Sequence, residues 1–138
     1  MAVLARAGAA DIAAMLPPDL PPYRTLRGPE VGLVMLRGRE GGAGPAFNMG
    51  EISVTRCTIR TETGQTGHAY VAGRDARLAE LAALADALLQ DPARQEVLQA
   101  TMIAPLAAAQ MRQREIVARK AAATRVDFFT MATMRSST

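Results

Sequence analysis

The chain has 138 residues, which allows one domain and excludes a multidomain enzyme. Its single cysteine, Cys57, cannot close an intrachain disulfide or ligate an iron–sulfur cluster alone, and no apolar run approaches the roughly 20 residues that span a bilayer. From its length, its single cysteine and the lack of a membrane-spanning run we expect one cytoplasmic domain over residues 1–138. The balance of 16 basic and 13 acidic residues, a net charge of +3, is not that of a nucleic-acid-binding protein.

The first part of the chain predicts a helix, a stiff linker and a strand. Residues 1–16 are rich in alanine and suit a helix that ends at Pro17-Pro18. Four prolines then favour an extended backbone over residues 17–22. Residues 31–36 are β-rich and continuously apolar, which predicts a strand that is covered on both faces.

The middle of the chain predicts a shaped loop and then an antiparallel hairpin. Residues 37–50 are too rich in glycine for a helix and too polar for a buried strand. Residues 51–61 return to a β pattern, but their apolar positions change phase, which indicates a bulge near Thr55-Arg56 or cover on both faces. A turn at residues 62–67 and a strand at residues 67–72 complete the hairpin.

The last part of the chain predicts helices. Asp75 is placed to cap a helix with one apolar stripe, and Asp91-Pro92 ends that helix. Further helices are expected over residues 93–102 and from Pro105 to about residue 123. The fold class is therefore α+β, with a central antiparallel sheet and flanking N-terminal and C-terminal helices.

The C-terminal tail, residues 125–138, carries two adjacent aromatic rings. In an extended chain Phe128 and Phe129 point to opposite sides, so one sheet face cannot cover both. We expect the tail to lie in a subunit interface, against a partner or an exchanged copy of this chain; the alternative is one ring in the home core and one in water. The expected interface residues are Val126, Phe128, Phe129 and Met131.

The chain is poor in groups for autonomous catalysis. His68 is its only histidine, so a site with two histidines cannot form, and no G-x-S-x-G nucleophile motif is present. His68 is expected to be an ordinary strand residue. We therefore assign no catalytic residue, no metal site and no cofactor to this chain.

An anion site is the one chemical site that the sequence suggests. Backbone amides of a glycine-rich loop can cradle an anion, although no Gly-Lys-Ser/Thr follows the loop, so the nucleotide-loop signal is weak. Nearby arginines are expected to form an anion-binding cluster, or else to be solvated and engaged in salt bridges. The arginines are Arg37, Arg39, Arg56 and Arg74, and the loop motif comprises Gly41, Gly42, Gly44, Asn48 and Glu51.

Five runs of sequence, in order along the chain, carry a resemblance to a known family. They are RGREGGAGPAFNMGEISVTRCTIR at 37–60, YVAGRD at 70–75, AELAALADALLQ at 79–90, IAPL at 103–106 and RVDFFTM at 125–131. Together they resemble the PhnG family of the bacterial carbon–phosphorus lyase system, over essentially the whole chain.

The resemblance implies a subunit of a core complex with PhnH-, PhnI- and PhnJ-like subunits and a second copy of the chain itself. It implies that the chain supports, with the catalytic PhnI-like partner and with PhnH- and PhnL-like proteins, the synthesis of ribose 1-methylphosphonate 5-triphosphate from ATP and methylphosphonate with release of adenine. Carbon–phosphorus cleavage would belong to the PhnJ-like subunit. ATP and phosphonate would therefore bind at the level of the complex.

Two alternatives belong to other classes of function. One is a free-standing basic module that binds nucleic acid through the arginine-rich last helix. The other is an independent small enzyme that uses His68 or Glu51 as a base. The leading hypothesis is a subunit that docks on a PhnI-like partner and helps to position ATP and phosphonate.

Overall fold

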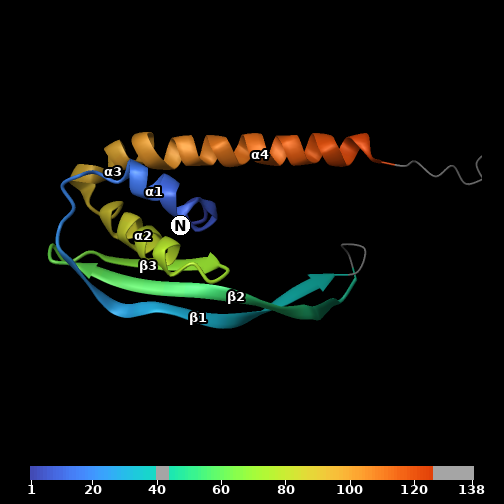
Figure 1. The fold of residues 1–138 in the computed structure, drawn as a ribbon, viewed down its shortest axis with the longest axis horizontal. Coiled ribbons are helices and arrows are strands. Elements are labelled where there is room, and N and C mark those ends of the chain that lie inside the picture. The colour runs from blue at the N-terminus through green and yellow to red at the C-terminus, as the bar shows by residue number, and fades with distance from the viewer. Residues whose placement is uncertain (40–43, 126–138) are drawn as a thin grey trace, which may run out of the picture. The chain divides into compact units, whose positions relative to one another are not determined.

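A computed structural model describes residues 1–39 and 44–125 of the chain, in an α+β arrangement (Figure 1). Along the chain, a three-stranded antiparallel sheet in the order β1-β2-β3 follows the N-terminal helices and precedes the C-terminal helices, as predicted. The chain divides into two units, residues 1–107 and residues from 108 onward. The elements are η1 (Leu4–Arg6), α1 (Ala9–Met15), β1 (Tyr23–Arg39), β2 (Ala46–Thr61), β3 (Thr66–Ala72), α2 (Ala76–Leu88), α3 (Pro92–Leu98), a π-helical turn (Gln99–Ile103) and α4 (Ala104–Ala123).

The N-terminal helix is interrupted, contrary to the prediction of one helix over residues 1–16. A short 3₁₀ helix, η1, ends at an extended Ala7, and the extended Gly8 precedes α1. Glycine is a poor helix former, and here its extended backbone starts a new helix. The predicted stop is confirmed, because Leu16 is extended before Pro17 and α1 ends there.

β2 pairs with β3 as predicted, but it also forms with β1 a long hairpin that the sequence analysis did not predict. β1 has 17 residues and pairs with β2 from Tyr23↔Thr61 to Arg39↔Ala46. The prediction of a loop over residues 37–50 is therefore wrong for residues 37–39 and 46–50, which are in strands. Backbone hydrogen bonding between the two strands overrides the weak strand propensity of their glycines and polar residues.

Two of the strand irregularities lie on β1, close to the place where the sequence predicted one on β2. β2 pairs with both neighbours in continuous register around Thr55 and Arg56, so the bulge predicted there is wrong. The nearby extra residues belong to β1, on either side of Arg27. A further extra residue lies on β2, between Asn48 and Gly50. The apolar positions of β2 change phase because Ile52 and Val54 lie on one face of the strand, whereas Cys57 and Ile59 lie on the other.

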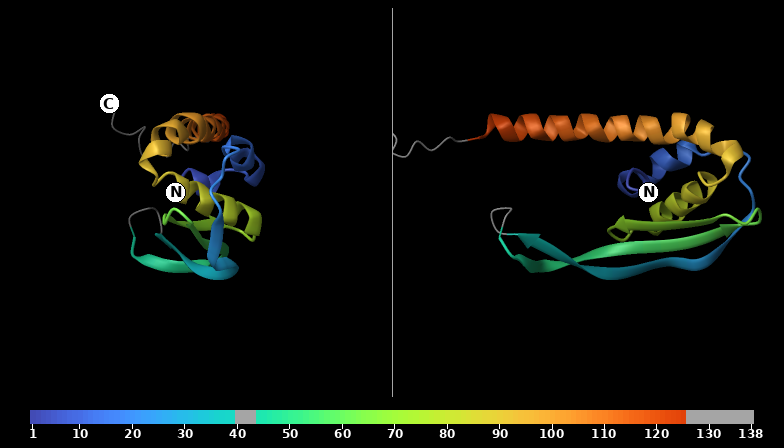
Figure 2. Two further views of the ribbon diagram at one scale, coloured as in Figure 1. Left: turned by 90° about the vertical axis from the view of Figure 1, so that its left-hand side faces the viewer. Right: turned by 180° about the vertical axis from the view of Figure 1, so that it is seen from behind.

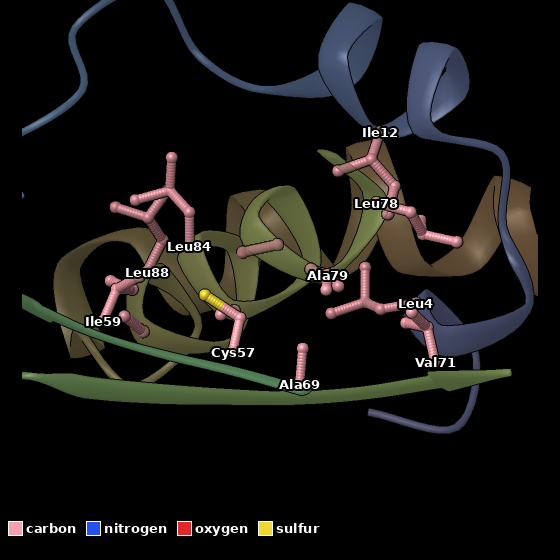
Figure 3. Packing of buried hydrophobic residues seen from close by; sticks show 14 of the residues in the cluster. Leu4, Ile12, Cys57, Ile59, Ala69, Val71, Leu78, Ala79, Leu84 and Leu88 are labelled. Atoms are coloured by element: carbon pink, nitrogen blue, oxygen red, sulfur yellow. The ribbon is translucent and has the colours of Figure 1, made fainter. Parts of the chain in front are cut away.

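The core lies between α2 and one face of the sheet, with α1 packed on α2 (Figures 1 and 3). Small side chains dominate it, so α2 and the sheet approach closely. The residues of α2 and the strands meet Leu4 and Ile12 from the N-terminal helices, as Figure 3 shows. Fully buried members include Leu4, Ile12, Ile59, Leu84, Met102, Val71, Thr55 and Cys57.

The helix cap predicted at Asp75 is confirmed and Asp91 adds a cap that was not predicted, whereas one predicted helix boundary is absent. Asp75 accepts a hydrogen bond from the backbone N–H of Leu78 (2.8 Å), and Asp91 accepts one from Ala93 (3.0 Å). The helices expected over residues 93–102 and from Pro105 onward are joined by the π-helical turn, so the chain does not break there. Within the described ranges, no helix is both long enough and apolar enough to cross a membrane.

Candidate functional site

Beyond the end of β3, the first two strands continue as a two-stranded ribbon (Figure 2). β3 pairs with β2 only from Val54 to Arg60, whereas β1 accompanies β2 along its whole length. Residues 33–39 and 46–53 therefore have one neighbouring strand each, and we call them the β1–β2 arm. A lone two-stranded ribbon is marginally stable in water, so the arm depends on further contacts.

The strand register decides which face of the arm each side chain occupies, because directly paired residues share a face. We call the face that α2 covers over the three-stranded part the helix face, and the opposite one the back face. Leu33, Met35, Arg37 and Arg39 lie on the helix face. The back face of the arm carries Val34, Leu36, Phe47, Ile52 and Met49, the last of which packs over Gly38.

The arm places Arg37 and Arg39 side by side on the helix face near its far end. They are two residues apart in β1, and Arg37 is paired with Asn48 of β2. The Arg39 Nη1 donates a hydrogen bond to the carbonyl oxygen of Gly44 (3.0 Å). Glu51 lies on the same face, opposite Met35. Two of the predicted anion-binding arginines thus lie near three residues of the loop motif, Gly44, Asn48 and Glu51.

Arg56 belongs to an ion-pair network on the back face of the three-stranded part. Its Nη2 lies 3.1 Å from Oε2 of Glu30, and Arg27 Nε donates to the same oxygen at 2.9 Å. These contacts, with Arg27 first, lower the pKa of the Glu30 carboxyl below its ordinary value of 4.5. Arg56 therefore already has a carboxylate partner.

Arg74 follows β3, and its Nε donates a long hydrogen bond to Oγ of Ser53 (3.4 Å). Ser53 shares the helix face with Thr55, whereas Arg56 lies on the back face. Arg56 is eight residues along β2 from Asn48, the partner of Arg37, which is roughly 25 Å at the usual rise of a strand. Within one chain, the structure therefore does not bring the four predicted arginines into one cluster.

The sequence analysis missed a pair of neighbouring arginines, Arg24 and Arg60, which lie on the back face. Arg24 and Arg60 are directly paired, although like charges directly opposite each other are unfavourable. Both line an open hollow of about 500 Å³, together with Thr61, Glu62 and Gly64. The alternation of side chains along a strand would have placed Arg56 and Arg60, four residues apart, on one face. The pairing of Arg60 with Arg24 could not be predicted, because no local sequence pattern sets the register of the two strands.

The remaining reactive side chains are separated from one another. His68 is exposed on β3, with Nδ1 3.2 Å from Oγ1 of Thr58, as expected of an ordinary strand residue. Cys57 is 1% exposed, and its burial raises the pKa of the thiol. Among residues 1–39 and 44–125, no three His, Cys, Asp or Glu side chains gather where they would hold a metal ion. Glu51, on the arm, is far along the hairpin from His68.

Comparisons with known proteins identify the family of this chain. The family model described as phosphonate metabolism protein PhnG matches residues 1–134. The chain belongs to the PhnG family. It is also 47% identical, over 116 residues, to the α-D-ribose 1-methylphosphonate 5-triphosphate synthase subunit PhnG of Rhizobium meliloti (strain 1021), with 82% of this chain and 72% of that protein covered. Neither comparison supports the alternative of a nucleic-acid-binding module.

Parts of the site predicted for this PhnG family member fall outside the described residues. They are Gly41 and Gly42 of the loop motif and the tail residues Val126, Phe128, Phe129 and Met131. Their roles in anion binding and in a subunit interface stay predictions. The described residues of the site are those of the arm, together with Arg56 and Arg74.

Proposed function

We propose that this chain is the PhnG subunit of a synthase that makes ribose 1-methylphosphonate 5-triphosphate from ATP and methylphosphonate in the catabolism of phosphonates. The observation that carries the proposal is the identity of 47% with the Rhizobium meliloti subunit, over most of both chains. We further propose a cytoplasmic complex in which the chain accompanies PhnI-, PhnH- and PhnJ-like subunits and a second copy of itself.

In this proposal the reaction centre belongs to the PhnI-like partner. A phosphonate oxygen forms a bond to the anomeric carbon of the ribose, the bond from that carbon to the adenine nitrogen breaks, and adenine leaves with the electron pair and takes up a proton. Such a displacement needs a general acid for the leaving group. The scattered positions of His68, Glu51 and the buried Cys57 support a role other than acid catalysis for this chain.

The proposed contribution of this chain is to hold the charge of the triphosphate. Arginine binds phosphate oxygens through paired N–H donors, and fixing the triphosphate sets the position of the anomeric carbon. Arg37 and Arg39 are the best placed of the four predicted arginines, because they lie together at the end of the arm. Arg56 is a weaker candidate, because Glu30 already neutralises it.

The test is a reconstituted synthase assay with PhnI-, PhnH- and PhnL-like partners that measures adenine release from ATP and methylphosphonate. Omission of this chain should abolish activity, and R37Q combined with R39Q should lower it at least about tenfold, the usual scale for loss of charged phosphate contacts. R77Q is the matched control, because Arg77 is an exposed arginine on α2. Full activity without this chain would refute the proposal.

A further inference from the structure

The β1–β2 arm exposes large apolar side chains on both of its faces. Each of six such residues is at least 42% exposed, and Leu33 and Met49 are 62% and 66% exposed. On the helix face these are Leu33 and Met35; on the back face they are Val34, Leu36, Phe47 and Met49. Contiguous apolar surface of this kind is rare on monomers and marks interaction sites.

The composition of the back face changes abruptly where β3 ends. Over the three-stranded part this face carries charged residues, among them Arg27, Glu30 and Arg56. Along the arm the same face carries only apolar side chains and glycine, from Ile52 to Phe47. Charged residues are depleted in the same way at the centres of protein–protein interfaces. The back face of the three-stranded part therefore has the composition of a solvated surface, whereas the back face of the arm has that of an interface.

We propose that the β1–β2 arm inserts into an apolar groove of the PhnI-like subunit of the synthase, which covers both faces of the arm. This inference rests on the proposed function, since it takes the partner to be a synthase subunit. The walls of the groove are apolar, to match Leu33 on one face and Leu36 on the other. Its far end holds the triphosphate oxygens that the proposed function assigns to Arg37 and Arg39.

Because both faces of the arm need cover, a different subunit is favoured over a second copy of this chain and over the chain's own C-terminal tail. Two copies of this chain that pack arm on arm across a twofold axis bury one face of each arm and leave the other in water. A single segment of the same chain, such as the tail at residues 126–138, would cover only one face at a time. A groove in a larger partner encloses a two-stranded ribbon on both sides and also completes its unpaired edges.

The experiment measures the affinity of the full-length chain for the PhnI-like subunit of the same complex. L33T combined with M35T alters only the helix face, and L36T combined with M49T alters only the back face; threonine keeps the strand propensity. Each pair should weaken binding at least about tenfold. Because these side chains are exposed in the isolated chain, its melting temperature should change little. The matched control is Y70T combined with V97T, at exposed residues outside the arm, and should keep the affinity within about twofold.

The outcomes separate this inference from the proposed function. If the unaltered chain binds the PhnI-like subunit and both arm variants bind equally well, the arm inference is overturned while the proposed function stands. If only one of the two double variants loses affinity for the PhnI-like subunit, insertion is overturned, because the arm then contacts the partner through one face only. If the isolated chain is a dimer that the arm variants dissociate without weakening the complex, a second copy is the occupant and the inference is wrong. Failure of the unaltered chain to join any synthase subunit contradicts the proposed function itself.

Discussion

Substitution of Gly67 by alanine tests the close approach of α2 to the sheet. Gly67 is the second residue of β3, directly beneath the helix. A methyl group on Gly67 would collide with the carbonyl oxygen of Ala83 and would lie 2.6 Å from the backbone nitrogen of Ala87. These are backbone atoms of a helix interior, which cannot rotate away as a side chain can. The helix or the strand must therefore move.

The cost of G67A follows from the two effects of the added methyl group. Overpacking of a core costs about 1–3 kcal/mol, and a collision with backbone belongs at the upper end of that range. Alanine also restricts the unfolded chain, which returns about 0.4–1 kcal/mol. The free energy of unfolding should fall by about 2 kcal/mol. For a chain of this length the melting temperature should then fall by roughly 6–10 °C.

Thermal and urea unfolding followed by circular dichroism would measure this loss. The matched control is G32A in β1, where the added methyl group meets no atom within 4 Å, and its stability should change by less than about 0.5 kcal/mol. Movement of α2 should also weaken the hydrogen bond from the His68 backbone N–H to Asp86 (3.0 Å), so exchange of that amide should accelerate. Equal melting temperatures for G67A and G32A would refute the packing argument.

Three further predictions concern single groups. The thiol of Cys57 should react with a disulfide reagent only after denaturation, because burial both shields it and raises its pKa; rapid reaction of the folded protein would contradict this. D75A should destabilise the protein by about 1 kcal/mol in urea unfolding through loss of the α2 cap, whereas D75N should retain most of the stability. In an NMR titration the Glu30 carboxyl should have a pKa below 4.5; because that pKa is lowered on folding, its stabilising contribution is present above about pH 4.5 and is lost as the pH falls through the folded value. R27Q should raise that pKa more than R56Q does, and the opposite order would contradict the assignment of Arg27 as the main cause.

Helix caps were predictable because their signals are local. An aspartate before an apolar stripe was enough to place the start of α2 at Asp75, and Asp91-Pro92 marked the junction with α3. The junction before Pro105 was not predictable in the same way. A π-helical turn carries the chain through it, and this i→i+5 pattern has no sequence signature that distinguishes it from a helix end.

Whether the four predicted arginines cluster depends on how β1 pairs with β2, and this long-range register could not be predicted from the sequence. Arg37 and Arg56 approach in space only if the segment between them is a compact loop, whereas the structure places residues 37–39 and 46–56 in paired strands. The alternation of a strand does predict that Arg37 and Arg39 share a face. The local part of the predicted site therefore survives in the fold, whereas the part that required a folded loop is spread along the hairpin.

The prediction that residues 31–36 are covered on both faces is wrong for the described chain, and the error is informative. A strand that alternates between core and solvent carries alternating apolar and polar residues, whereas Leu33 through Leu36 carry none that are polar. The described chain leaves all four more than two-fifths exposed. Composition reflects the environment of a segment in the working assembly, which for a subunit includes its partners. A strand with the sequence of a buried element and the exposure of a surface element is therefore what the inserted arm of a subunit should look like before it meets its groove.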